Sequence, residues 1–476
     1  MTAERPRTIP GFMVPVERGS LRILHAIHDF LPRHRAGSEI YAAELARAQA
    51  PRHHVTVVCA EYDPLRRHGD VTWRLHERTP VVEIVNNWVA SHFRDSYRSP
   101  LITDRLTQVL RAVQPHVLHV HNLLNLSFDL PAAARTLGIP VVATLHDYTL
   151  VCASGGQRVH RAESHICTTI DTDRCARCFA ESPFHSLLSV GPLARAAGHS
   201  SVVHRAARFV MSRFPQAARS AAIAVTSLAP ASVTASDIDE RLVSAAGVFR
   251  DIDLFVAPSQ SLGDEYVRLG VDRAKLRVSD YGFVPLQGVR RTAAKNGRLR
   301  IGFVGTLVWH KGVHVLIDAA RRLPRERFTL SIYGGTDVFP PYVAELREES
   351  NGLPIEFKGT FLHDQLADVY SQLDVLVVPS LWLENSPLVI HEAFMAGVPV
   401  VGARAGGIAD LVEHEKNGLL YESHDPSALA DALRRLIDDS SLLARLSRQM
   451  TPVKSIAQDA AEWDDVYAEL LGCRES

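Results

Sequence analysis

The 476-residue chain lacks any apolar run that approaches the ~20 residues of a membrane-spanning helix. It also lacks an excess of charge of either sign, because 52 Lys and Arg face 53 Asp and Glu for a formal net charge of −1. Short-period repeats and low-complexity tracts are absent as well. These absences argue against a membrane-spanning protein and against a global electrostatic grip on nucleic acid. The hydrophobic share of 46% is that of an ordinary globular protein.

Residues 1–19 lack the continuous apolar core of a signal peptide, and we expect them to form a loosely ordered tail. The expected compartment is therefore the cytoplasm, where structural disulfides are rare. Residues 182–214 mix apolar residues with arginines, a pattern that suits an amphipathic helix. This helix either packs on the first sheet or faces lipid or a lipid-linked acceptor, in which case the protein sits peripherally at the inner face of the membrane.

Segments typical of strands alternate with segments typical of helices along most of the chain, and the pattern restarts after a basic polar stretch at residues 290–297. The alternation predicts an α/β protein with two doubly wound halves, each a parallel sheet covered on both faces. We expect an N-terminal domain over 20–289, a C-terminal domain over 298–455 and a last helix over 456–472. That helix is predicted to return to the first domain.

The stretch "LENSPLVIHEAFMAG" raises a specific question, because it places Glu384 and Glu392 in a mostly apolar segment. We predict a strand that ends at Ser380, a loop, and a helix with Asn385 or Ser386 as its N-cap and Pro387 at its first position. Such a unit opens at the carboxyl edge of a parallel sheet, where these folds bind ligands. The start of the helix is itself suited to an anion.

Buried carboxylates need hydrogen-bond partners, and sugar hydroxyls are suitable donors. One carboxylate on a ribose, the other on a hexose and a phosphate between them would account for the pattern. The alternative is that Glu384 and Glu392 are structural, and cap helices or pair with arginines.

The wider context favours the first interpretation. The E-x7-E pattern, followed by "GVPVVGARAGGIADLV" and "NGLLYE", resembles glycosyltransferase family 4, the retaining nucleotide-sugar transferases of GT-B fold. "TLHDYTLVC" and the cysteines after it are similar to the bacterial exopolysaccharide-type branch of that family. The resemblance implies two Rossmann-like domains that face a central cleft, with the acceptor bound by residues 20–289 and the nucleotide sugar by residues 298–455.

The resemblance also implies roles for single residues. Glu384 contacts the transferred sugar, Glu392 holds the ribose, and His146 lies beside the donor sugar. Lys311 pairs with the diphosphate as a point charge. The remaining positions bring backbone close to the donor: Gly37 at the phosphates, Asn385, Ser386, Pro387 and Leu388 at the sugar and diphosphate, and Lys358 and Gly359 at the base.

The chain departs from the family pattern at two places. Thr306 stands where the family usually has an arginine on the diphosphate, and Arg404 and Arg35 are the candidates to replace it. The first loop reads "AGSE" where two adjacent glycines are usual. Other interpretations stay open: Lys311 as a surface lysine, His146 as a packing residue, and the glycines of "RAGG" as a turn rather than a close approach to the donor.

Four of the six cysteines fall in one hydrophilic insertion, residues 152–178, with the spacing C-x14-C-x7-C-x2-C. Four thiols so close together in a cytoplasmic protein suggest a structural zinc held by Cys152, Cys167, Cys175 and Cys178. An iron–sulfur cluster and free or redox-active thiols are the alternatives, and His160 and His165 are competing ligands. We expect Cys59 in the core and Cys473 in the tail.

These inferences predict transfer of a sugar from a nucleotide diphosphate sugar to a hydroxyl of a polysaccharide, a lipid-linked glycan or a small glycoside. The resemblance implies retention at the anomeric carbon, with the leaving diphosphate helping to deprotonate the acceptor. Three alternatives remain: an inverting transferase with His146 as base, a sugar-nucleotide epimerase, and a non-catalytic partner subunit. The last is suggested only by Thr306.

Overall fold

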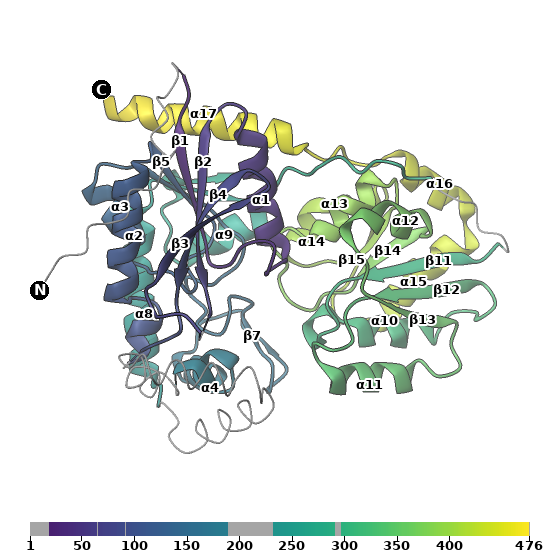
Figure 1. Ribbon diagram of the computed structural model, residues 1–476. Coiled ribbons are helices and arrows are strands. Elements are labelled where there is room, and N and C mark those ends of the chain that lie inside the picture. Colours follow the sequence, from purple (N-terminus) through teal and green to yellow (C-terminus); the bar gives the residue numbers. More distant parts are fainter. Residues whose placement is uncertain (1–18, 64, 91, 189–231, 291–296, 476) are drawn as a thin grey trace, which may run out of the picture.

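The computed structural model describes residues 19–63, 65–90, 92–188, 232–290 and 297–475. Figure 1 shows two α/β halves side by side, each built on its own sheet, with the last helix lying along the first half. The predicted N-terminal tail and most of the predicted amphipathic segment lie outside the described residues. Of the helices that the structure describes, none combines the length and the apolar character needed to cross a membrane.

The first half contains an eight-stranded sheet with the order β10-β9-β6-β5-β1-β2-β4-β3. Its neighbouring strands are parallel except for the antiparallel pair β3–β4. The strands are β1 Arg22–Ile27, β2 His54–Glu61, β3 Val71–His76, β4 Thr79–Val85, β5 Val117–Val120, β6 Val141–Thr144, β9 Leu254–Ala257 and β10 Leu276–Val278.

The second half contains a six-stranded, fully parallel sheet with the order β13-β12-β11-β14-β15-β16. The parallel α/β architecture predicted from the sequence is therefore confirmed in both halves. The strands are β11 Leu299–Val304, β12 Phe328–Tyr333, β13 Ile355–Gly359, β14 Val375–Val378, β15 Val400–Ala403 and β16 Gly418–Tyr421.

Helices cover both faces of each sheet. They are α1 Gly37–Gln49, α2 Pro100–Val113, α3 Leu130–Thr136, α4 Thr172–Ala180, α8 Ala235–Asp251, α9 Gln260–Arg268, α10 Val313–Ala320, α11 Pro340–Glu349, α12 Leu366–Ser371, α13 Leu388–Met395, α14 Gly406–Leu411, α15 Pro426–Asp438, α16 Ser440–Arg448 and α17 Ile456–Glu475. Short 3-10 turns lie at Phe93–Ser96, Arg273–Lys275, Trp309–Lys311 and His363–Gln365.

The side chains of β1 show how the first sheet is sandwiched. Ile23 and Ile27 pack into the core that contains α1 and α17, whereas Leu24 and Ala26 pack into the core that contains α2, α3 and α8. This alternation follows from the two-residue period of a strand. His25 lies between Ile23 and Ile27, so it is a polar residue on the α1 side of the sheet and is fully buried there.

The hairpin of β3 and β4 was not predicted from the sequence. Its two-residue turn is formed by Glu77 and Arg78, which have φ values of 47° and 78°. Turns of this shape are usually marked by Asn or Gly, which tolerate positive φ. Because Glu and Arg occupy the turn instead, the local sequence gives no hairpin signal.

Helix α17 crosses from the second half and packs against α1. Trp463 and Tyr467 are buried at this contact, and the Tyr467 hydroxyl lies 2.7 Å from Nδ1 of His119 on β5. The chain therefore ends on the half where it begins, and α17 completes one core of the first sheet.

The cysteine-rich insertion forms a small unit of its own beside the first sheet. It consists of a two-stranded hairpin, β7 Val159–His160 and β8 His165–Ile166, followed by α4. Helix α4 packs against α8. The insertion thus lies against a helix of the first half.

Candidate active site

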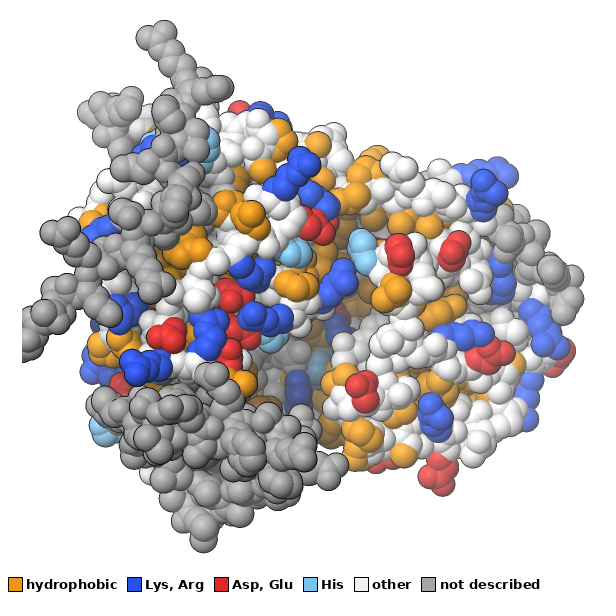
Figure 2. All heavy atoms as spheres, viewed as in Figure 1, with side chains coloured by type: hydrophobic (Ala, Val, Ile, Leu, Met, Phe, Trp, Pro, Cys, Tyr) orange, Lys and Arg blue, Asp and Glu red, His pale blue; other side chains and the backbone are white. Residues whose placement is uncertain are grey.

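A cavity of about 330 Å³ lies between the two halves. Figure 2 shows the molecule hollowed along this boundary. The first half contributes Gly37, Ser38, His146, Asp147 and Tyr281 to its lining. The second half contributes Phe303, Val304, Gly305, Thr306, Lys311, Val377, Val378, Ser380, Trp382, Glu384, Asn385, Ser386, Pro387, Leu388 and Val389.

The starts of two helices meet at this cavity. Helix α1 begins at Gly37 in the first half, and α13 begins at Leu388 in the second. A Cβ atom on Gly37 would lie 2.9 Å from Cδ1 of Leu388, so a larger residue would require the Leu388 side chain to shift. Each helix start carries backbone N–H groups without an intrahelical partner and the positive end of a dipole. The cavity is therefore suited to a polyanion held by both halves.

The prediction that Asn385 or Ser386 caps α13 is wrong. Asn385 donates through Nδ2 to the carbonyl of His146 at 2.7 Å, and Ser386 donates through Oγ to Asp280 at 2.8 Å. Both side chains are used to tie the second half to the first, so the helix begins one residue later, after Pro387, without a side-chain cap. The first N–H groups of α13 therefore have no side-chain cap.

Glu384 is 6% exposed and is held by two donors. Its Oε1 atom accepts from Nζ of Lys311 and from Oγ of Ser380, both at 2.6 Å. Nζ of Lys311 also lies 5.3 Å from the ring centre of Trp382. A cation and a carboxylate thus stand together at the wall of the cavity, where a diphosphate and a sugar hydroxyl could each take one of them.

Glu392 lies apart from this pair and does not line the cavity. Its Oε2 atom accepts from the Tyr370 hydroxyl at 2.7 Å. Burial raises the pKa of Glu392, and the hydrogen bond from Tyr370 acts in the opposite direction. The donor that the buried Glu392 carboxylate requires, which the sequence did not identify, is therefore a tyrosine from the neighbouring helix α12.

His146 follows β6 and lines the cavity from the first half. Its Nε2 atom lies 3.0 Å from Nδ1 of His121, and its ring stacks on Tyr281 at 5.2 Å with an interplanar angle of 11°. Burial lowers the pKa of His146 to about 3, with the charge of His28 acting in the same direction. The imidazole is therefore neutral at physiological pH.

The cavity brings together nine residues that the sequence singled out: Gly37, His146, Thr306, Lys311, Glu384, Asn385, Ser386, Pro387 and Leu388. It does not bring in Glu392, Lys358, Gly359 or Arg404.

Neither candidate for the missing arginine lines the cavity. Arg404 pairs with Glu422 at 3.3 Å, and Arg35 lies in a separate cavity beside Phe30. Lys358, at the predicted base position, pairs with the exposed Glu356. The cation contributed to the cavity wall is Lys311.

Sequence reasoning missed Ser380, Trp382 and Asp147. Ser380 ends the predicted strand, four residues before Glu384. A hydroxyl so close in sequence to a carboxylate that was expected to be buried is the signal that could have identified Ser380. Asp147 follows His146 directly, and its carboxylate accepts from Asn122 Nδ2 at 2.8 Å and from the Thr149 N–H at 2.7 Å. No local pattern marks such long-range partners.

Gly406 and Gly407, at the start of α14, approach protein backbone. A Cβ atom on Gly407 would lie 2.0 Å from the carbonyl oxygen of Asn385, and one on Gly406 would lie 2.7 Å from that of Glu384. The Gly407 N–H donates to the Glu384 carbonyl at 2.7 Å. The two glycines therefore position the loop that carries Glu384, a role that neither interpretation of the sequence had considered.

The four cysteines of the insertion line one small cavity of about 30 Å³. They surround it without reaching ligand spacing, since among the described residues no three of these sulfur atoms lie within 4.8 Å of one another. The competing histidines are engaged elsewhere: His160 with Glu181 at 2.9 Å, and His165 with Arg174 at 2.8 Å. Cys59 is buried in the core of the first sheet, and the side chain of Cys473 lies outside the described residues.

Two family models match the chain. Residues 35–227 match "Glycosyltransferase Family 4", and residues 298–439 match "Glycosyl transferases group 1". A D-inositol 3-phosphate glycosyltransferase of Xylanimonas cellulosilytica is 31% identical over 51% of this chain and 62% of its own length. The sulfoquinovosyl transferase SQD2 of Arabidopsis thaliana is 29% identical over 42% of each chain. The matches thus span less than two thirds of these relatives.

Solved structures share the fold over nearly the whole chain. Alr3699/HepE of Anabaena, crystallised with UDP and glucose, has a TM-score of 0.58 and 18% identity, covering 95% of this chain and 100% of its own. Sucrose-phosphate synthase of Thermosynechococcus elongatus has a TM-score of 0.61, also with 18% identity and the same coverage. At this identity the likeness concerns the fold, and it confirms the predicted GT-B arrangement.

The approach of Gly407 to the Glu384 loop gives a testable prediction. Gly407→Ala should force the loop to move, because the new methyl group meets a backbone oxygen rather than a flexible side chain. We expect a loss of about 1–3 kcal/mol in the free energy of unfolding, measured by chemical denaturation. Gly472→Ala, where nothing lies within 4 Å of the new methyl group, is the control and should not destabilise. Equal stability of the two variants would contradict the packing role.

Proposed function

Because this chain belongs to glycosyltransferase family 4, with the GT-B fold, we propose that it transfers a sugar from a nucleotide diphosphate sugar to a hydroxyl acceptor. The observation that carries the proposal is the cavity between the halves, where the starts of α1 and α13 meet beside Lys311 and Glu384. Because the Anabaena protein has been crystallised in complex with UDP-glucose, UDP and its sugars are the first probes.

The diphosphate is proposed to lie between the two helix starts. Its charge is complemented by the N–H groups that follow Ala36 and Pro387, and by Nζ of Lys311. Lys311 is paired with Glu384 in the wall of the cavity. The arrival of the diphosphate gives Lys311 a second anionic partner, so that Glu384 becomes available to accept from sugar hydroxyls.

Two carboxylates line the cavity, Glu384 and Asp147, and both are engaged by donors of the protein. We assign Glu384 the sugar contact, with His146 facing the sugar from the first half. Family membership supports retention, with the leaving diphosphate taking the proton of the acceptor. The neutral His146 keeps an inverting route chemically open, and the anomeric configuration of the product, read by NMR, separates the two.

The acceptor is proposed to be a hydroxyl of a polysaccharide, a lipid-linked glycan or a small glycoside. It would enter from the first half, which forms the opposite wall of the cavity. A lipid-linked acceptor would bring the protein to the cytoplasmic face of a membrane. Transfer from a bound UDP-sugar to water-soluble acceptors and to acceptors in vesicles distinguishes these sources.

We also propose that the four cysteines of the insertion hold a structural zinc. They line one cavity, and that cavity is lined as well by Arg158, which is 6% exposed. Arg241 is buried nearby, interacts electrostatically with Cys152 and Cys175, and forms no ion pair with a carboxylate in the described part of the chain. Arg158 already pairs with Glu265, whereas Arg241 donates to the backbone carbonyls of Thr149 and Leu150. The charge of Arg241 therefore favours a neighbouring site of negative charge, as four thiolates on Zn²⁺ provide.

Without a metal, the thiols of Cys175 and Cys178 would stay protonated. Burial raises the pKa of Cys175 to about 12 and that of Cys178 to about 11, with the neighbouring cysteines acting in the same direction. A zinc ion would draw the sulfur atoms together to its own bond lengths and hold a hydrophilic segment that packing alone does not hold. Its proposed role is therefore structural.

The first functional prediction concerns Glu384. Glu384→Gln keeps the shape of the side chain, removes its negative charge and replaces one acceptor oxygen with an NH2 donor. We therefore expect kcat to fall about 100-fold or more, while the KM of the donor changes less. The measurement is sugar transfer, or donor hydrolysis, with a panel of nucleotide sugars. Glu413→Gln is the matched control, because Glu413 forms an exposed pair with Lys416 at 2.7 Å. Wild-type kinetics in both variants would refute the sugar contact.

The second concerns Lys311. Lys311→Ala should weaken UDP by about 1.5–3 kcal/mol, or roughly ten- to a hundredfold in Kd, and leave uridine unaffected. Isothermal titration of both ligands measures this, with Lys416→Ala as the control for loss of an exposed lysine.

The Lys311→Ala/Glu384→Gln double variant identifies the cause of that loss. If the loss came only from repulsion by an unpaired Glu384, the double variant would regain wild-type affinity. If Lys311 contacts the diphosphate itself, the deficit persists. An equal loss for UDP and uridine in the single variant would remove Lys311 from the phosphate site.

The third concerns the cysteines. Protein purified without added metal should carry about one zinc per chain by elemental analysis. Cys175→Ser and Cys178→Ser should lose the metal and become sensitive to proteolysis within residues 153–179. Cys59→Ala, a buried cysteine outside the cluster, should keep its zinc. A zinc content near zero, with all four thiols freely titratable in the native wild-type protein, would remove the metal site.

A further inference from the structure

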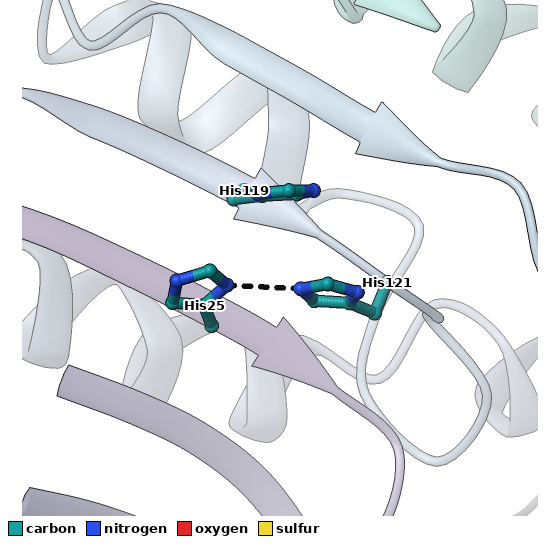
Figure 3. Close-up of side chains that lie close together, drawn as sticks. All are labelled: His25, His119 and His121. Carbon is teal, nitrogen blue, oxygen red and sulfur yellow. Dashed lines mark hydrogen bonds between the residues drawn. The ribbon is translucent and has the colours of Figure 1, made fainter. Parts of the chain in front are cut away.

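A row of buried histidines lies directly beneath the cavity. His25 comes from β1, His119 from β5 and His121 from the residue after β5, and all three are at most 4% exposed. Figure 3 shows that His25 and His121 point toward one another from neighbouring segments of the sheet, with His119 beside them. The fourth, His146, follows β6 and lines the cavity. Buried histidines cost stability unless they are bonded, so their partners indicate what they do.

Three of these histidines form one unbroken chain of hydrogen bonds that starts at Gln49, the last residue of α1. Oε1 of Gln49 lies 2.9 Å from Nε2 of His25, and Nδ1 of His25 lies 2.9 Å from Nε2 of His121. Nδ1 of His121 then lies 3.0 Å from Nε2 of His146. This chain of hydrogen bonds therefore runs from the C-terminal end of α1 to the wall of the cavity. Figure 3 shows its middle bond, between His25 and His121.

A bound metal is the obvious alternative, because ligand atoms of His25, His119 and His121 lie within 4.8 Å of one another. All six ring nitrogens, however, already have a partner. His119 is the member outside the chain: its Nδ1 faces the Tyr467 hydroxyl and its Nε2 faces Oγ1 of Thr144, both at 2.7 Å. With every nitrogen engaged, the cluster is better explained as a hydrogen-bond network.

Such a chain has a direction. A neutral imidazole carries one N–H and one lone pair, so a donor at one end of the chain fixes donor and acceptor at every later position. Nε2 of Gln49 lies 3.3 Å from the Tyr467 hydroxyl, which leaves Oε1 to accept from His25. His25 then accepts from His121, and His121 accepts from His146. His146 consequently holds its proton on Nε2 and keeps a lone pair on Nδ1.

We propose that Gln49 is a positioning residue which, through His25 and His121, fixes His146 as the Nε2–H tautomer and makes its Nδ1 a hydrogen-bond acceptor for a hydroxyl in the cavity. The hydroxyl belongs to the donor sugar or to the acceptor, so the catalytic consequence rests on the proposed transferase function. The assignment of the His146 tautomer does not rest on that function. Reversing the Gln49 amide would reverse every bond and present an N–H instead, which is the wrong group for a hydroxyl that must donate.

The tautomer of His146 is measured by nitrogen NMR of the full chain labelled in histidine, with His146→Gln used to assign the signals. We expect the wild type to show a single tautomer with the proton on Nε2. Gln49→Met keeps the volume and removes the acceptor, and His25→Leu breaks the chain, so both should give a mixture of tautomers. His116→Leu is the control for loss of a histidine from the first half, because Nδ1 of His116 accepts from the Arg22 N–H at 3.2 Å and His116 forms none of these hydrogen bonds, so the variant should keep the wild-type tautomer.

Turnover provides the second readout. Gln49→Met and His25→Leu should lower kcat at least about tenfold with little change in the KM of the donor, part of the ~100-fold or more that an oriented acid–base group contributes. His116→Leu should retain kcat per folded molecule. The proposal is overturned if wild-type His146 carries its proton on Nδ1, if both chain variants keep the wild-type tautomer, or if the tautomers mix and kcat stays unchanged. If the wild-type protein shows the expected tautomer but no turnover on any nucleotide sugar, the result supports the proposed chain of hydrogen bonds and rejects the proposed function.

Discussion

The close approach of two helix starts, at Gly37 and Leu388, is the constraint on which the rest of the structure depends. Each helix follows a parallel strand of its own sheet, so each sheet must present its carboxyl edge to the cavity for the two to meet. A Cβ atom at residue 37 would meet the Leu388 side chain, which would have to shift. Two positive dipole ends in one place favour an anion or solvent between them, which supports the proposal that the interface between the halves binds the diphosphate.

The loop before α13 shows how the chain meets this constraint. Its polar side chains do not cap the helix. Asn385 donates to the His146 carbonyl, and Ser386 donates to Asp280, so both bind the first half. Gly406 and Gly407 support the same loop from behind. Glu384 is thereby held by Ser380 and Lys311 in a buried position, where a hydrogen bond to a sugar gains more than it would in water.

The sequence was sufficient for the architecture and for nine of the residues that line the cavity, because strands, helices and the spacing of short motifs are local properties. It was insufficient wherever a residue's role depends on a distant partner. Glu392 was correctly expected to need a donor, but Tyr370 lies 22 residues away. The turn of Glu77 and Arg78 lacks the residues that usually mark it. Gln49 reads as one more helical residue, and only the fold places it against His25.

The central claim is that a nucleoside diphosphate binds with its phosphates between the starts of α1 and α13. A crystal structure of the full chain with UDP tests this most directly. The account predicts phosphate oxygens within hydrogen-bond distance of the backbone N–H groups of Ser38 and Leu388 and of Nζ of Lys311. An ordered UDP whose diphosphate lies elsewhere, with Lys311 still paired to Glu384 and the two helix starts occupied only by solvent, would contradict it.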